Sequence, residues 1–420
     1  MIVSRGLSRV STRSGHHLVV SKVNRQDTTC GVPGLSRLST RSGHHLVVSK
    51  VIRPDTTCGV LFLSKSRIMN NYLKGRGAQL NTINPFIKQT VVTEHIEGLD
   101  EPLLSDAKTQ VFIEHPKKIV NKMTSPDIRM FNTINPYQGC EHGCIYCYAR
   151  NTHNYYGFSA GLDFERKIMV KLSAPQLLRE HFNKASYKPE PITLSGNTDC
   201  YQPLERKYKI TRALLEVMLE YKNPVGMITK NSLILRDIDI LSELAKLNLV
   251  HVMVSITSLR EELRLLMEPR TATAGKRLLV IETLSKHGVP VGVMTAPIVP
   301  GLNSDEMPAI IKAVADRGGV TAGYTIVRLN GEIKNIFHDW LYKNMPDAAD
   351  KVWNQIKACH GGQVNDSRWG TRMSGDGPEA EAIGQLFAMA KKKYMDGRSM
   401  PEYDLTLFKR PPVGGQMELW

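Results

Sequence analysis

Residues 126–332 alternate between short apolar, β-branched runs and stretches with apolar residues at helical spacing. The apolar runs are residues 129–137, 191–198, 224–231, 250–258, 289–299 and 322–329, and helical spacing occupies 174–185, 211–222, 237–247, 275–288 and 305–318. Continuous apolar runs are typical of strands buried on both faces, as in parallel sheets. The alternation therefore predicts an α/β fold with six β/α units, a partial TIM-like (β/α)6 barrel with N- and C-terminal extensions.

Three cysteines lie in one short loop after the first predicted strand. Cys140, Cys144 and Cys147 have the spacing C-x3-C-x2-C, with no fourth cysteine close behind. A closed structural zinc site and an ordinary electron-transfer [4Fe–4S] cluster each use four ligands. Three thiolates on a four-iron cube would leave one iron open to a small ligand. The alternatives are a zinc site that takes His142 as its fourth ligand, or three unconnected thiols.

This cysteine loop, with aromatic Tyr146 before the last cysteine and a strand before the loop, resembles that of the radical S-adenosylmethionine (SAM) superfamily. The resemblance implies the partial barrel and a [4Fe–4S] cluster on Cys140, Cys144 and Cys147. It also implies that the open iron binds the amino and carboxylate groups of SAM, with Tyr146 beside the cofactors. Reductive cleavage would give a 5′-deoxyadenosyl radical and would need an electron donor such as flavodoxin or ferredoxin.

Polar residues follow the predicted strands, at the end where β/α barrels place their sites. We expect the turn after the second strand to lie near the SAM amino group, since a glycine lets the backbone approach a ligand. The turn consists of Gly196, Asn197, Thr198 and Asp199. A simple βα turn is the alternative. After the third strand, Lys230 is a candidate partner for the SAM carboxylate. Ser255 and Thr257 end the fourth strand and either bind the ribose hydroxyls or satisfy local backbone groups.

Two charged segments lie further along the barrel. We expect Glu268 and Arg270 to form a structural ion pair. Arg328, which follows the sixth strand, is a candidate for binding a substrate phosphate or a carboxylate at the end of the sheet.

The segments TDCYQPLERKYKITR, TKN, EPR and SRWGTRMSGDG resemble the branch of the superfamily called spore-photoproduct-lyase-like, over about residues 72–395. Spore photoproduct lyases split a thymine dimer, and a separate cysteine returns a hydrogen atom. The resemblance implies damaged DNA as substrate, with Cys200 as the candidate hydrogen donor. A small buried core cysteine is the alternative for Cys200. RNA, a peptide or a small metabolite are alternative substrates, and a non-catalytic iron–sulfur or zinc binding module is the alternative function.

The first 68 residues contain a two-copy repeat. Residues 6–32 recur almost unchanged at 34–60, a period of 28 residues. Two copies are too few for a stacked solenoid, so we expect residues 1–68 to be disordered or to be a translated upstream repeat, with Met69 as the natural start. A metal site from His16, His17 and Cys30, repeated at His44, His45 and Cys58, is the alternative.

The first 68 residues also distort the charge balance, because they hold 11 Lys and Arg against 2 Asp and Glu. The remaining residues hold 44 Lys and Arg against 38 Asp and Glu, a net charge of only +6. Charge alone is therefore weak evidence for nucleic acid.

The remaining boundaries follow from composition. We predict an N-terminal lead-in at residues 69–125, the barrel at 126–332 and a helical extension at 333–420. The extension holds four aromatic residues at helical spacing, Phe337, Trp340, Tyr342 and Trp353. Together with Arg368 and Arg372, they predict either a packed core or a nucleic-acid clamp.

Seven cysteines with three in one loop imply no disulfide framework, and no apolar run reaches the ~18 residues of a membrane span. We therefore predict a cytoplasmic protein that does not bind a membrane.

Overall fold

The computed structural model describes the backbone of four short strands before residue 50, and residues 73, 75–82, 84–86, 109–127 and 132–411. The chain divides into two units, residues 1–72 and 73–420. In the first unit, each copy of the repeat carries one antiparallel hairpin. The strands are β1 (Leu7–Ser11), β2 (His17–Ser21), β3 (Ser36–Ser39) and β4 (His45–Val48).

The two hairpins have the same register. Ser8 pairs with Val20 in the first copy, and Ser36 pairs with Val48 in the second, each 28 positions later. The metal-site alternative stays untested, because its histidine and cysteine side chains lie outside the described residues. The expectation that residues 1–68 are disordered or precede the natural start also stays a prediction.

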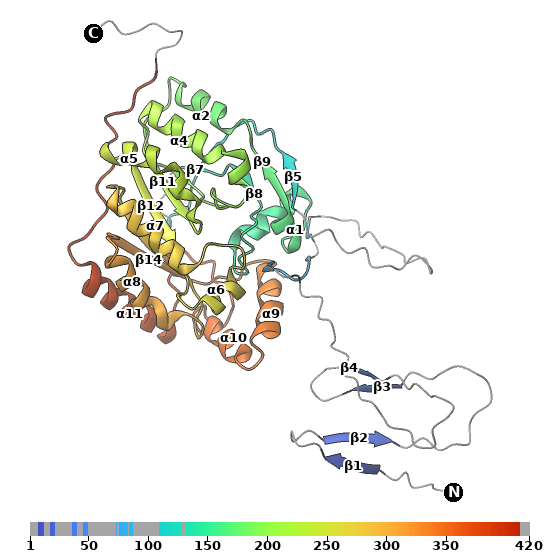
Figure 1. Cartoon of the computed structure of the whole chain (residues 1–420). Helices are drawn as coiled ribbons and strands as arrows, with labels where there is room; N and C mark the ends of the chain where they lie inside the picture. The colour runs from blue at the N-terminus through green and yellow to red at the C-terminus, as the bar shows by residue number, and fades with distance from the viewer. Residues whose placement is uncertain are drawn as a thin grey trace, which may run out of the picture. The chain divides into compact units, whose positions relative to one another are not determined.

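The second unit is built on a seven-stranded sheet in the order β14-β13-β12-β11-β10-β7-β6 (Figure 1). Neighbouring strands from β7 to β14 pair in parallel, and β6 pairs antiparallel with β7. The strands are β6 (Val120–Lys122), β7 (Asn132–Ile134), β10 (Ile192–Leu194), β11 (Val225–Thr229), β12 (Val250–Ser255), β13 (Val291–Ile298) and β14 (Thr321–Ile326). All six predicted parallel strands are present, so the predicted α/β class and partial barrel are confirmed.

Helices follow the strands and lie on the outer side of the sheet (Figure 1). The five predicted ones are α2 (Ala174–Phe182), α4 (Ile210–Tyr221), α5 (Ile238–Lys246), α7 (Ala274–Lys286) and α8 (Met307–Ala315). In α4, Ile210, Leu214 and Met218 recur every four residues and are buried, so the apolar stripe faces the sheet. Shorter elements are η1 (Tyr148–Tyr156), α1 (Leu162–Arg166), α3 (Glu205–Tyr208), η2 (Ser232–Asp237), α6 (Glu261–Met267) and η3 (Ser304–Glu306).

A small second sheet leads into the cysteine loop. Its order is β5-β9-β8, with β5 (Gln110–Ile113) parallel and β8 (Tyr137–Gln138) antiparallel to β9 (Lys167–Val170). The sequence pattern did not predict this sheet, because strands of two to four residues carry too little periodicity. Its β8 ends two residues before Cys140, so the sheet fixes where the cysteine loop begins.

The C-terminal helices pack beside the barrel. They are α9 (Ile333–Asn344), α10 (Ala349–Ala358) and α11 (Pro378–Met395), of which α11 packs on α8 and β14. Phe337, Trp340 and Trp353 are buried in a hydrophobic cluster with residues 144–146 of the cysteine loop, as the packing interpretation predicts, whereas Tyr342 is exposed. In the part of the chain that the structure describes, no helix has the length and apolar character to span a bilayer.

The segment between α10 and α11 bridges the open side of the barrel. Ile326 N–H, at the end of edge strand β14, donates to the Met373 carbonyl (2.9 Å). Close by, Gly370 N–H donates to Asp127 (2.8 Å), and Arg372 pairs with the same carboxylate. Because Asp127 follows the other edge strand, β6, this segment joins the two edges of the sheet.

Candidate functional site

The cysteine loop is held by a buried ion pair. Arg150 donates to the Cys144 carbonyl through Nε and Nη2 (3.0 and 2.8 Å) and pairs with Glu165 at 2.6 Å. Both side chains are fully buried. Gly143 has a φ of 70°, and a Cβ there would lie 3.0 Å from Glu165 Oε2. The loop thus needs a glycine at this position for its conformation and for its close contact with the carboxylate.

The three loop cysteines form a group of free thiols. Cys140 and Cys144 are buried and Cys147 is half-buried. Burial raises the pKa of Cys140 well above its usual range and that of Cys144 to about 12, and the neighbouring thiols act in the same direction. Buried thiolates that influence one another in this way are stable only beside a compensating positive charge, which the irons of an iron–sulfur cluster provide. The donor set therefore fits a cluster held by three thiolates.

His142 does not complete a zinc site. Its Nδ1 lies 3.4 Å from Asp199, and its Nε2 lies 3.1 Å from Asn231 Nδ2. Burial lowers the pKa of His142. Among residues 73–411, as far as they are described, no three His, Cys, Asp or Glu side chains converge as ligands of one metal ion. The three cysteines and His142 therefore do not gather on a single ion, as a zinc site would require, whereas a four-iron cube takes each thiolate on a different iron.

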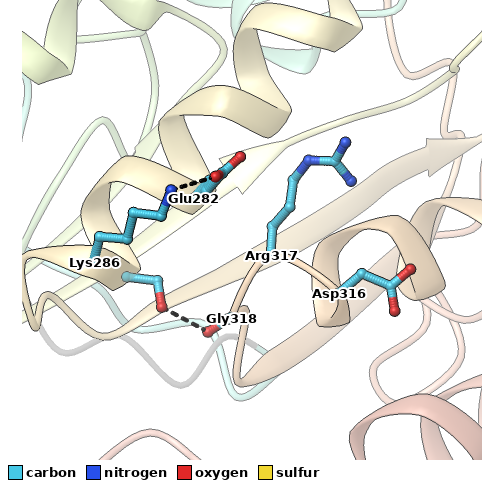
Figure 2. Close-up of a pocket in the computed structure, with 6 residues that line it drawn as sticks. Glu282, Lys286, Asp316, Arg317 and Gly318 are labelled. Atoms are coloured by element: carbon cyan, nitrogen blue, oxygen red, sulfur yellow. Dashed lines mark hydrogen bonds and ion pairs between the residues drawn. The ribbon is translucent and has the colours of Figure 1, made fainter.

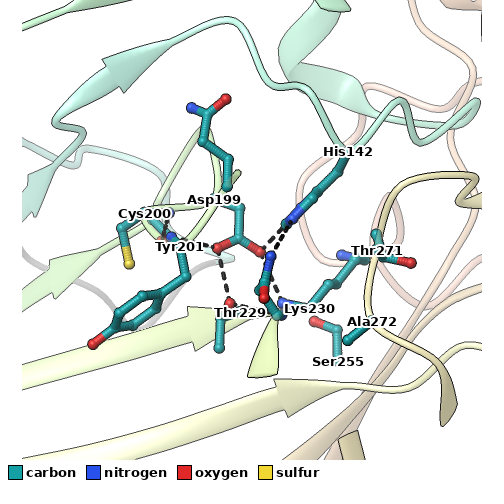
Figure 3. A network of polar contacts seen from close by, with 12 residues as sticks. His142, Asp199, Cys200, Tyr201, Thr229, Lys230, Ser255, Thr271 and Ala272 are labelled. Carbon is teal, nitrogen blue, oxygen red and sulfur yellow. Dashed lines mark hydrogen bonds and ion pairs between the residues drawn. The ribbon is translucent and has the colours of Figure 1, made fainter. Parts of the chain in front are cut away.

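Asp199 is the centre of a polar network at the ends of β10 and β11 (Figure 3). Its carboxylate accepts hydrogen bonds from Thr229 Oγ1 and the Lys230 N–H, both at 2.8 Å, and from the Tyr201 N–H at 2.9 Å. With His142 on its fourth side, the carboxylate is fully occupied. Asp199 therefore orients the Lys230 backbone and the His142 ring, and its side chain has no free position for a ligand.

The turn before Asp199 packs against the cysteine loop. A Cβ on Gly196 would lie 2.8 Å from the Thr133 methyl, so only glycine fits there. Asn197 N–H donates to Asn135 Oδ1 (2.7 Å), and Thr198 Oγ1 donates to the Tyr137 carbonyl (2.6 Å). The Asn197 side chain also donates, through Nδ2, to Gln138 Oε1 (3.1 Å). The side chains of Asn197 and Thr198 are thus bound to the chain itself, and a ligand would approach the backbone of the turn.

Lys230 is the cation of this site. Its ammonium lies 6.0 Å from the centroid of the Tyr146 ring, and within the described residues no carboxylate comes within 4 Å of it. Burial disfavours the charged form, but the nearby Cys144, Glu268 and Asp199 raise the pKa of Lys230 overall. The side chain is thus a charged donor without a carboxylate partner among the described residues.

A second buried network lies behind Tyr146 and is centred on Glu268. The carboxylate, which is fully buried, pairs with Arg277 and accepts hydrogen bonds from Tyr146 and from Thr257 Oγ1 (2.9 Å). Burial opposes its ionisation, but Arg277 and Lys230 lower the pKa of Glu268 to about 2. Arg277 was not among the predicted site residues, since an arginine on the amphipathic helix α7 carries no signal of a buried role.

This network corrects two expectations. The predicted ion pair between Glu268 and Arg270 is wrong, because Glu268 pairs with Arg277 and Arg270 lies 3.5 Å from Glu141. The Thr257 hydroxyl donates to Glu268 and is not free to donate to a ribose. Ser255 is buried, and its carbonyl accepts a hydrogen bond from Arg277 (2.9 Å). This placement favours a role in local hydrogen bonding over binding of the ribose hydroxyls.

Cys200 lies in the main hydrophobic core. It is fully buried, and its sulfur points away from His142 and Lys230 (Figure 3). Its backbone is fixed by Ser195 Oγ and Thr211 Oγ1, each at 2.7 Å. This placement favours the packing role over that of hydrogen donor.

A recess elsewhere on the barrel is unrelated to this site. Glu282, Lys286, Asp316 and Arg317 line it where α7 and α8 end, before strands β13 and β14 begin (Figure 2). It therefore lies at the amino end of the sheet, opposite to the end where β/α barrels place their sites.

Comparisons with known proteins agree with this geometry. Residues 134–314 match the family model of the radical SAM superfamily. An uncharacterized protein of Mycobacterium tuberculosis is 30% identical over 238 residues, 56% of this chain and 70% of its own length. One from Methanocaldococcus jannaschii is 26% identical over 250 residues, 60% of this chain and 89% of its own.

Among solved structures, the fold is similar to spore photoproduct lyase complexed with dinucleoside spore photoproduct. The TM-score is 0.52 at 15% sequence identity, covering 68% of this chain and 80% of the lyase. A variant of the same lyase with bound AdoMet and the dinucleoside also has a TM-score of 0.52.

Proposed function

The chain belongs to the radical SAM superfamily, whose members use a [4Fe–4S] cluster and SAM, and we propose that it is an enzyme that repairs a lesion in DNA. We further propose that Cys140, Cys144 and Cys147 hold the cluster and that SAM lies across the ends of β10, β11 and β12. When bound, the cluster supplies the electron that cleaves SAM to a 5′-deoxyadenosyl radical. The single observation that supports this most is the group of three free thiols, two of them buried and one half-buried, near the ammonium of Lys230.

In this proposal, the chain orients SAM through a few side chains. The ammonium of Lys230 binds the SAM carboxylate, since a partly buried cation without a protein partner favours a counter-charge. The backbone at Gly196 approaches the amino group of SAM. Asp199 and Glu268 position other residues and do not contact SAM themselves: Asp199 accepts a hydrogen bond from the Lys230 N–H, and Glu268 accepts one from the Tyr146 hydroxyl.

The substrate assignment rests on the shared fold and on the branch motifs. The likeness to the lyase shows a shared fold, and the branch motifs favour a DNA lesion. The placement of Cys200 in the core argues that a group other than its thiol returns hydrogen to the product. We propose a cytoplasmic location with a reducing partner such as flavodoxin or ferredoxin, supported by the free cysteines.

Anaerobic reconstitution tests the cofactor assignment. The wild-type protein should bind four irons, turn brown and convert SAM to 5′-deoxyadenosine under dithionite. Cys140→Ala, Cys144→Ala or Cys147→Ala should each lose the cluster, because two thiolates cannot hold the cube. Cys359→Ala is the matched control, since Cys359 is buried but far from the loop in sequence. Equal iron loss in the control, or a colourless protein with stoichiometric zinc, would contradict the proposal.

Turnover tests the substrate. The reconstituted protein with SAM and dithionite is incubated with ultraviolet-irradiated and undamaged DNA, and the lesions are quantified by chromatography. Loss of a lesion only in the irradiated DNA supports the proposal. Active SAM cleavage without lesion loss would leave RNA, a peptide or a small metabolite as the substrate.

A further inference from the structure

Arg328 is a half-buried guanidinium without a protein partner. It lies two residues after β14, at the carboxyl end of the sheet where the proposed SAM site also lies. No hydrogen bond or ion pair engages its side chain in the described part of the chain. Burial lowers the pKa of Arg328, and the neighbouring Arg372 lowers it further. Partial burial of an unpaired charge is costly, so this arrangement favours an anion from outside the chain.

The nearest carboxylates are already committed. Asp127 pairs with Arg372 and accepts the Gly370 N–H at 2.8 Å. Asp366 accepts the Nη2 and Nε of Arg368 at 2.7 and 3.0 Å. Neither carboxylate pairs with Arg328, although both lie close enough to influence its pKa. Both carboxylates near Arg328 are therefore neutralised by other arginines, and neither offers Arg328 a free negative charge.

Two exposed aromatic side chains lie near Arg328 and Arg372. Tyr148 directly follows Cys147, and its hydroxyl donates to the Gly196 carbonyl. The Tyr148 ring is 54% exposed and lies close enough to Arg328 to influence the pKa of that guanidinium. Trp369 is 59% exposed and lies against the Arg372 guanidinium, 3.9 Å from ring centroid to Cζ. Exposed aromatics beside cations are the means by which proteins bind the bases and phosphates of single strands.

We propose that Arg328 binds a phosphate of an unpaired nucleic-acid segment of the substrate and that Trp369 stacks on an adjacent base. The inference rests on the proposed function and identifies the groups that would position its substrate. A guanidinium fork matches the geometry of a phosphate, and Arg328 is a separate cation from Lys230, the proposed SAM partner. The anion would bind at the mouth of the barrel, next to the segment that follows the cysteine loop.

Fluorescence anisotropy on the reconstituted full chain with SAM tests this. The probes are a fluorescein-labelled 12-nucleotide single-stranded DNA, the RNA of the same sequence and a labelled polyglutamate peptide. Arg328→Gln should weaken oligonucleotide binding by at least about tenfold and reduce the salt slope by about 1. Arg328→Lys should recover part of the affinity, and Trp369→Ala should weaken binding without changing the slope. Arg317→Gln, at the recess on the opposite end of the sheet, is the control and should bind like the wild type (Figure 2).

Several results would overturn the inference. Equal affinities for Arg328→Gln and Arg317→Gln would remove Arg328 from the binding site. Polyglutamate binding that depends on Arg328, without oligonucleotide binding, would identify a carboxylate ligand. If Arg328→Gln does not fold, unchanged binding by both Arg328→Lys and Trp369→Ala would also refute it. Iron content and SAM cleavage are measured on the same wild-type sample. Their absence would refute the proposed function, whereas their presence without oligonucleotide binding would refute only this inference.

Discussion

Replacing Glu268 by Gln should destabilise the protein by removing a charge from a fully buried pair. In the folded state, Arg277 and Lys230 hold the pKa of Glu268 at about 2, against an ordinary value of 4.5. A shift of this size corresponds to about 3 kcal/mol of folding stability at neutral pH. Removing one partner of a buried pair typically costs a similar amount, about 3–5 kcal/mol, because the other charge is left uncompensated.

The pH dependence has a definite sign. A carboxyl with a lowered pKa in the folded state contributes its full stability above its unfolded value, and loses that stability as the pH falls toward the folded value. The difference between wild type and Glu268→Gln should therefore be constant above about pH 5. It should be smaller by about 1 kcal/mol at pH 3.5.

Urea unfolding followed by circular dichroism at pH 7 and pH 3.5 measures this effect. Glu282→Gln is the matched control, since Glu282 forms an exposed ion pair with Lys286 on the same helix as Arg277. Such surface pairs contribute little, so the control should unfold like the wild type. Adding Arg277→Met to Glu268→Gln should restore part of the stability, because no charge is then left unpaired. A loss below about 1 kcal/mol, or one equal to that of the control, would refute the reasoning.

Three further predictions concern SAM binding, acid stability and the N-terminus. Lys230→Met should weaken SAM binding by about tenfold or more, whereas Lys246→Met, in an exposed pair with Glu243, should not, as calorimetry with SAM would show. His153 is fully buried and neither ring nitrogen has a partner in the described part of the chain, and burial lowers the pKa of His153 to about 4. Stability should therefore fall as the pH drops from about 6.5 toward 4. His153→Phe should flatten that region of the profile in thermal melts, and an unchanged slope would contradict this account. A chain that begins at Met69 should load its cluster and cleave SAM as the full chain does; loss of iron in that protein would show that the repeat supports the fold.

The sequence by itself determined the barrel and the cysteine loop, because both depend on local patterns. Buried strands such as β11 and β12 are continuous apolar runs, and helices such as α4 repeat their apolar residues every three or four positions. The spacing of Cys140, Cys144 and Cys147 restricts the ligand chemistry without reference to any other part of the chain. Lys230 could also be located, since it directly follows a predicted strand.

Tertiary structure decided which polar side chains remain free for a ligand. Asp199, Thr198 and Thr257 are polar residues at strand ends like Lys230, yet hydrogen bonds to distant parts of the chain occupy their side chains. Arg277, on α7, pairs with Glu268, at the end of α6, and the residues around Arg277 give no indication of that contact. The same applies to Asp127 and Arg372, which are 245 positions apart and join the two edges of the sheet. Hydrogen bonds and charge pairs depend on distances in space, which a residue pattern specifies only within a single element.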